Sequence, residues 1–235
     1  MYNFIYLDTE TTGVGEEDRL LQVATMQEGQ PTRNEMFRPP LPIKIGAMAT
    51  HHITEKMVEG APIFEDSAFA TELQTTLDQP ENVLIAHNAQ FDIGMLEKEG
   101  LKVPQHICTL KLAHKLDTEG HLDKHALQYL RYAWGFEIYA TAHDALGDVL
   151  VLEKVFLRIQ DEYEKQYPLD PDETVRLMIK HSSEPVLIAR VPFGKHRGTH
   201  FNAVPKSYLN WMLSTDLSED LKYTAKFYLN AGTRN

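Results

Sequence analysis

The stretch that decides the fold is NFIYLDTE, which occupies residues 3–10. Side chains alternate along a β-strand, so Tyr6, Asp8 and Glu10 would share one face. The apolar residues imply that this face is largely buried, where two unpaired carboxylates would be costly. A D-x-E pair on its own is more often a solvated strand end, but on a buried face it indicates a bound cation.

The rest of the chain combines strand patterns and helix patterns. Further strands are expected at residues 20–26, 32–39 and 82–87, and helices at residues 64–78, 91–99, 123–134, 144–164 and 172–181. The Pro-rich run at 39–44 predicts a loop. Three strands, a helix, a strand and then further helices predict an α/β fold with a mixed sheet flanked by helices.

Two further acids and one histidine are candidates for the same site. Asp92 follows the strand expected at 82–87, although an acid there could simply favour the first turn of a helix. Asp148 continues the apolar stripe of the helix at 144–164, where an acid needs a partner. His143 is either a core histidine bonded to the backbone or part of a site.

Together these residues match a specific chemistry. Two-metal phosphoryl transfer requires several carboxylates around ions roughly 3.5–4 Å apart. Mg²⁺ prefers oxygen ligands and leaves positions for phosphate and water. A neutral imidazole beside the attacking water can take its proton. The acids Glu16, Glu17 and Asp18, by contrast, are expected to form a solvated turn without a metal role.

The charge of the chain is unevenly distributed. The formal net charge is −11, which alone argues against a nucleic-acid partner, because phosphate binding usually requires basic residues. Residues 185–235 contain seven Lys/Arg and three Asp/Glu, a balance of +4, so the remainder carries −15. An acidic body with a basic C-terminal segment is compatible with an enzyme whose acids bind metal while other parts hold phosphates.

The composition indicates the class of protein, and a Pro-rich run indicates the domain organisation. Hydrophobic residues make up 43% of the chain and charged residues 24%, as in ordinary globular proteins. The single cysteine, Cys108, is expected to be a small buried residue, and we expect a cytoplasmic protein with no signal peptide and no membrane partner. The run PLDPDE after Tyr167 predicts a boundary, with domains at 1–167 and 185–235 and a linker with a short helix at 168–184.

Three short motifs carry a resemblance to a known family. The runs DTETTG at 8–13, HNAQFD at 87–92 and HDALGD at 143–148 resemble the three exonuclease motifs of the DEDD superfamily. In the third run a histidine, His143, stands five residues before the aspartate, Asp148. This spacing resembles the motif of the DEDDh branch of that superfamily. The run IGAMATHHIT at 45–54 resembles the H-x-I-T stretch of that family, which lies near the terminal nucleotide.

The resemblance implies a fold, an activity and roles for individual residues. The implied fold is ribonuclease H-like, with a five-stranded mixed sheet, and the implied activity removes nucleotides from a 3′ end with two Mg²⁺ ions, for which Mn²⁺ can substitute. By position, Asp8, Glu10, Asp92 and Asp148 would be metal ligands and His143 the general base. Substrate contacts are expected from Thr9, Thr11, Thr12, Gly13, Val14, His51, His52, Asn88 and Phe91.

The basic C-terminal segment resembles the small module of the exonuclease X group in the same superfamily. The runs PFGKHRG at 192–198 and VPKSYLNW at 204–211 carry this resemblance. One interpretation is a structural cap, in which a helix buries Tyr208 and Trp211. The other is that Lys195, His196 and Arg197 contact phosphates. The two interpretations are compatible.

The motifs leave several functions open. We expect a DNA exonuclease that acts in repair or DNA degradation, so the expected partner is DNA with a 3′ end. A DEDDh ribonuclease would use the same ester chemistry, so RNA is the alternative substrate. A proofreading subunit would need a polymerase-binding tail, which the C-terminal module does not resemble. The intact acids argue against a non-catalytic nucleic-acid-binding module, and the oligomeric state is open.

Overall fold

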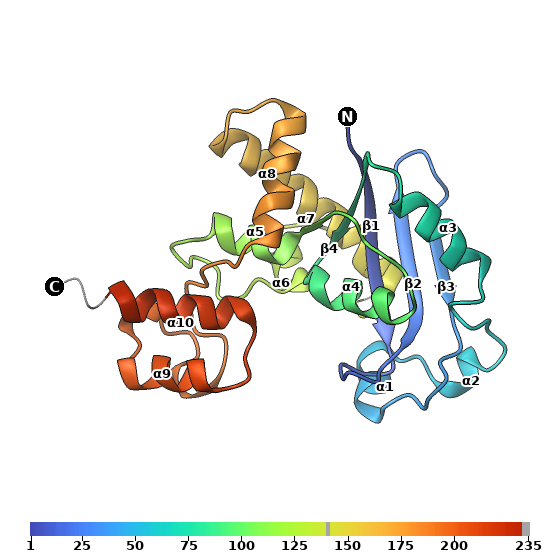
Figure 1. Cartoon of the computed structure of the whole chain (residues 1–235), viewed down its shortest axis with the longest axis horizontal. Coiled ribbons are helices and arrows are strands. Elements are labelled where there is room, and N and C mark those ends of the chain that lie inside the picture. The colour runs from blue at the N-terminus through green and yellow to red at the C-terminus, as the bar shows by residue number, and fades with distance from the viewer. Residues whose placement is uncertain (140–141, 232–235) are drawn as a thin grey trace.

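A computed structural model of the chain describes residues 1–139 and 142–231. Its centre is a five-stranded sheet in the order β3-β2-β1-β4-β5 (Figure 1). The strands are β1 (Asn3–Thr11), β2 (Leu20–Gln27), β3 (Arg33–Met36), β4 (Asn82–Ala86) and β5 (His106–Cys108). Neighbours are antiparallel from β3 to β1 and parallel from β1 to β5. The expected mixed five-stranded sheet is therefore confirmed.

Helices cover both faces of the sheet. They are α1 (Ile45–His51), α2 (Glu55–Val58), α3 (Ala68–Leu77), α4 (Ala89–Lys98), α5 (Thr109–Leu116), α6 (Leu127–Ala133), α7 (Ala145–Gln166) and α8 (Pro171–Ser183). One hydrophobic core joins the sheet to α5, α6, α7 and α8, and a second joins its other face to α3 and α4. None of the described helices has the length and hydropathy that crossing a bilayer requires.

Strand β1 lies at the centre because its side chains serve both cores. Tyr6 belongs to the core under α7, whereas Ile5 and Leu7 belong to the core under α3 and α4. The ring of Phe156 on α7 meets Tyr6 at a centroid distance of 5.7 Å. Asp8 continues the Tyr6 face, so the acidic end of β1 lies on the side of the sheet that α7 covers.

Helix α7 presents the apolar stripe expected from its sequence. Asp144 caps its N-terminus by accepting a hydrogen bond from the Gly147 N–H at 3.3 Å. Val149, Leu152 and Asp148 are all buried, and Asp148 is only 8% exposed. The prediction that Asp148 lies on the buried face of this helix is confirmed.

The elements that the sequence pattern did not predict include β5, α5 and α1. Strand β5 has only three residues, too few to show a period of two, and α5 follows it directly. Helix α1 begins directly after the Pro-rich loop. The expected linker contains α8, where the Ser182 hydroxyl accepts a hydrogen bond from the Cys108 N–H at 2.9 Å. The three domain boundaries remain a prediction, and residues 232–235 of the last segment lie outside the described part.

The C-terminal module has a hydrophobic core of its own. It contains short 3₁₀ turns at Gly194–His196 and Phe201–Ala203, followed by α9 (Lys206–Ser214) and α10 (Glu219–Ala231). Tyr208 is buried as expected, but the expected burial of Trp211 is wrong, because its side chain is 45% exposed. Trp211 lies on the outer face of α9 and contacts other aromatic rings at the surface.

Candidate metal centre

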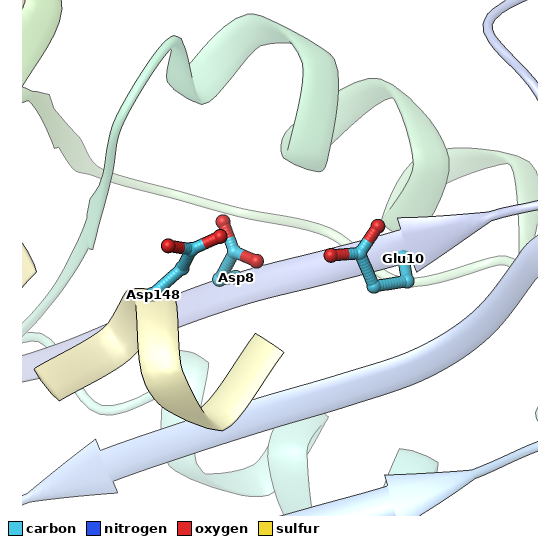
Figure 2. A group of neighbouring side chains, drawn as sticks. All are labelled: Asp8, Glu10 and Asp148. Carbon is cyan, nitrogen blue, oxygen red and sulfur yellow. The ribbon is translucent and has the colours of Figure 1, made fainter. Parts of the chain in front are cut away.

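Three carboxylates converge at the end of β1 (Figure 2). Asp8 and Glu10 project from β1, and Asp148 projects from the first turn of α7. One oxygen of each carboxylate lies within 4.8 Å of the other two. A single cation placed among them is therefore within reach of all three side chains.

Asp92 reaches the same region from the first turn of α4. Its side chain is 3% exposed, and its Oδ1 accepts a hydrogen bond from the Thr9 hydroxyl at 2.8 Å. Thr9 lies between Asp8 and Glu10 on β1, so this bond ties Asp92 to the strand that carries the other two acids. The charge of Asp92 also acts on both Asp8 and Glu10.

Burial raises the pKa of all four carboxyl groups, and repulsion from the other carboxylates adds to the shift of Asp8 and Glu10. Burial is the larger cause for Asp8, whose pKa rises well above its usual range, and the charges of Asp92 and Asp148 add to it. The same causes raise the pKa of Glu10 to about 8. Burial raises the pKa of Asp92 to about 7 and that of Asp148 above its usual range, although hydrogen bonds oppose both shifts.

These four groups fit a divalent cation. Poorly solvated carboxylates that repel one another are costly without a positive charge between them. Their donor atoms are all oxygens, which suits hard cations such as Mg²⁺ and Mn²⁺. The donor set and the repulsion therefore point to the same class of ligand.

His143 lies at the rim of this site. Its backbone has a left-handed conformation with φ of 59°, and its N–H donates to Asp148 Oδ2 at 3.1 Å. The side chain is exposed, so the alternative of a core histidine is wrong. Its charge acts on both Asp148 and His51, so the imidazole lies within electrostatic range of both residues.

Two glutamines that the sequence did not single out hold α7 and Asp148 in place. The Gln128 side chain donates to Asp148 Oδ1 at 2.5 Å. Gln22 is 2% exposed, and it donates to Asp144 Oδ1 at 3.1 Å and accepts from the Ala145 N–H at 3.3 Å. Gln22 interrupts the apolar run of β2, and this polar residue on a buried strand is the feature of the sequence that could have identified it.

The turn after β1 is built around Asp18, which corrects the expected solvated turn. Asp18 is fully buried, and it accepts hydrogen bonds from the Thr12 hydroxyl at 2.8 Å and Lys44 Nζ at 2.5 Å. Burial alone would raise the pKa of Asp18, but these bonds and one from the Gly15 N–H hold it below its usual range. A Cβ on Gly13 would lie 2.7 Å from Asp18 Oδ2, so the turn requires glycine there. Glu16 and Glu17 are exposed as expected.

The other expected substrate contacts fall into two groups. Thr9, Thr11, Thr12 and His51 are buried and make internal hydrogen bonds. His51 accepts a hydrogen bond from the Ile53 N–H and donates one to the Thr11 carbonyl at 3.1 Å. These bonds link α1 to the end of β1 and stabilise the turn that follows β1. The accessible side chains are Val14, at 86% exposed, with His52 and Asn88, while Phe91 is partly buried. Lys195 and Arg197 are exposed on the C-terminal module.

Sequence comparison places this arrangement among known proteins. The exonuclease family, of RNase T type, matches residues 5–156. Exodeoxyribonuclease 10 of Escherichia coli (strain K12) is 28% identical over 240 residues, which cover 95% of this chain and 97% of that protein. A DNA polymerase III subunit epsilon-like protein of Rhodobacter capsulatus is 31% identical over 173 residues, or 66% of this chain, but the match spans only 23% of that protein.

Solved structures share the fold. Exonuclease X in complex with 5′ overhanging duplex DNA superposes with a TM-score of 0.60 at 24% identity, covering 77% of this chain and 99% of that one. E. coli exonuclease I in complex with a dT13 oligonucleotide superposes with a TM-score of 0.64 at 16% identity, covering 94% of this chain and 61% of that one. At these identities the likeness concerns the fold alone.

The repulsion among the carboxylates predicts that the protein becomes more stable when one acid is neutralised by mutation. It also predicts that the protein becomes more stable when Mg²⁺ is added. In EDTA, Glu10→Gln should raise the melting temperature by roughly 2–4 °C, or about 1 kcal/mol, because a neutral amide replaces a carboxyl group whose ionised form burial and neighbouring charges disfavour. Mg²⁺ should stabilise the wild type more than the variant. Thermal unfolding with and without Mg²⁺ measures both effects. The exposed Glu17→Gln is the matched control, and a Glu10→Gln curve identical to it in both buffers would contradict the prediction.

Proposed function

Because the chain belongs to the exonuclease family, we propose that it removes nucleotides from the 3′ end of DNA by hydrolysis. The observation that carries this proposal is the convergence of Asp8, Glu10 and Asp148 within 4.8 Å at the end of β1. DNA is the proposed substrate because the chain covers 97% of a relative named exodeoxyribonuclease 10. A role in DNA repair or degradation in the reducing cytoplasm is part of the proposal, in keeping with the single buried cysteine.

The four acids are the proposed metal ligands. Asp8, Glu10, Asp92 and Asp148 would hold two Mg²⁺ ions, and Mn²⁺ would substitute. When bound, the ions supply Lewis-acid chemistry, which lowers the pKa of the attacking water and offsets the charge that develops on the phosphate. Thr9 and Gln128 orient Asp92 and Asp148 through the hydrogen bonds described above.

His143 is the proposed general base. Its imidazole takes a proton from water as the oxygen attacks the terminal phosphorus. The bond between phosphorus and the 3′ oxygen of the preceding nucleotide breaks, that oxygen takes a proton from solvent, and a nucleoside 5′-monophosphate leaves. The hydrogen bond from the His143 N–H to Asp148 Oδ2 would hold the proposed base close to the proposed metal ligand Asp148.

The turn after β1 is the proposed seat of the terminal nucleotide. Asp18 and His51 fix its backbone from inside, while the Val14 side chain projects into solvent. Backbone N–H groups of this turn would face the terminal sugar, and Val14 would pack against the terminal base. His52, Asn88 and Phe91 would complete the contacts around that nucleotide.

A panel of matched substrates tests the proposal. The wild type should degrade 3′-end-labelled DNA in Mg²⁺, and neither EDTA-treated enzyme nor Asp148→Asn should do so. Single-stranded DNA, blunt duplex, 3′-overhang duplex and RNA of one sequence compare the substrates. Faster degradation of RNA would replace the DNA assignment with a ribonuclease, and Mg²⁺-independent cleavage would overturn the metal mechanism.

His143→Ala should lower kcat by about 10²–10⁴-fold, the usual contribution of a general base. KM should change little, because the exposed imidazole holds no other part of the fold. Steady-state hydrolysis of labelled single-stranded DNA measures both constants. The exposed histidine variant His121→Ala, outside the proposed site, is the control, and a near-normal kcat in His143→Ala would remove His143 from the mechanism.

Val14→Ala should raise KM for single-stranded DNA by about 3–10-fold, because two methyl groups worth roughly 0.8 kcal/mol each would leave the base contact. The side chain is 86% exposed, so stability should not change. The control is Leu169→Ala, an exposed aliphatic residue between α7 and α8. Equal KM values in the two variants would show that Val14 does not contact the base.

A further inference from the structure

We infer that the C-terminal module carries a binding surface for single-stranded DNA, which holds the strand upstream of the terminal nucleotide. This inference rests on the proposed function. The surface consists of Phe193, Lys195, Arg197, Tyr208 and Trp211, and we call it the module platform. It combines the exposed Trp211 ring, backed by Tyr208 and Phe193, with two exposed basic side chains. Aromatic rings and basic side chains are the two features that bind unpaired strands without sequence preference.

One ring of the platform, that of Trp211, is exposed but held in place by the other two. Trp211 is 45% exposed, and its ring lies 4.9 Å from that of Tyr208 and 6.5 Å from that of Phe193. A tryptophan that served only as a cap would face the module core, which Tyr208 joins but Trp211 does not. A braced, exposed ring offers a base a stacking face at small entropic cost.

The basic part of the platform lies on the adjacent hairpin. Val191 and Thr199 are bonded across it, and between them Lys195 Nζ lies 5.6 Å above the Tyr208 ring. A Cβ on Gly194 would lie 2.7 Å from the Tyr208 hydroxyl, so glycine lets the hairpin press against α9. Within residues 1–139 and 142–231, no carboxylate forms an ion pair with Lys195 or Arg197. Both charges therefore remain available for phosphates.

A cleft between the module and the exonuclease domain leads from Arg197 of the platform toward α6. It has a volume of about 410 Å³, and its walls include Arg197 from the module and Lys124 and Ala126 from the exonuclease domain. Ala126 directly precedes α6, where Gln128 donates to Asp148. Two residues of chain span at most ~7 Å, so the lining of the cleft comes within that length of chain of a residue whose side chain contacts Asp148.

The arrangement of the domains agrees with this path. In the view of Figure 1, α9 and α10 lie toward the end of the molecule at which β1 ends. The module is anchored there, because Arg190 Nε donates to the Gly120 carbonyl at 2.9 Å and Lys111 pairs with Asp220 at 3.6 Å. A strand with its 3′ end at the carboxylates would pass Lys124 and reach Arg197.

The charge distribution of the chain explains why a long strand would need the platform. Residues outside the module carry −15, which repels a polyanion everywhere except at bound metal ions, whereas residues 185–235 carry +4. A dinucleotide engages only the metal centre, but a longer strand must be held against that repulsion. The platform should therefore affect long substrates and leave the shortest ones unchanged.

Binding measurements on variants test the inference. In an Asp148→Asn background with labelled dT20, Lys195→Ala/Arg197→Ala should reduce the slope of log K against log salt by about 0.7 per lost phosphate contact. Trp211→Ala should raise Kd by about 5–100-fold, the stacking contribution of one base, and Trp211→Phe should restore most of the affinity. An abasic oligonucleotide should lose the Trp211 effect and keep the salt effect.

The matched control is Lys102→Ala/Arg176→Ala, which removes the same charge from the end of the molecule where β5 and α8 begin. With Asp148 intact, the platform variants should hydrolyse a thymidine dinucleotide at the wild-type rate. Folded platform variants with the control's salt slope and an unchanged Kd would overturn the inference. A wild type that binds dT20 through the platform but hydrolyses neither substrate would instead overturn the proposed function.

Discussion

Repulsion among carboxylates held together in a poorly solvated place is the constraint on which the rest of this structure depends. Asp8, Glu10 and Asp148 lie within 4.8 Å of one another, and burial is the largest cause that raises the pKa of each. The charges of the other carboxylates raise the pKa of Asp8 and Glu10 further. Such a group is a cost to the free energy of folding until a cation enters it. The fold must therefore supply the surplus stability that keeps the site assembled without metal.

That surplus comes from rigid connections between elements far apart in the chain. Two hydrophobic cores fix β1 between α7 and the pair α3 and α4. Polar side chains then set the finer geometry: Thr9 holds Asp92, and Gln22 holds the first turn of α7. Asp18 fixes the turn beyond β1 in the same way. Each is buried and bonded, so none costs an unpaired polar group.

The charge of the chain is uneven. Residues outside the C-terminal module carry −15, which is unfavourable for a polyanion, and the basic module, at +4, opposes this. One residue of the module, Trp211, does not fit a purely structural role. Trp211 lies on the outer face of α9, where packing within the module does not need it. Exposed aromatic and basic side chains on an anchored module are suited to an extended, unpaired strand.

The sequence by itself determined the features that depend on local periodicity. Alternation along residues 3–10 and the stripe of α7 predicted the face of Asp8 and Glu10 and the burial of Asp148, and the motifs predicted the family. Only the tertiary structure decided that Thr9 binds Asp92 across 83 residues, that Asp18 is buried, and that Trp211 is exposed. The physical reason is that a period shows which side of an element a residue occupies. What faces that side depends on packing between distant segments, which no local pattern records.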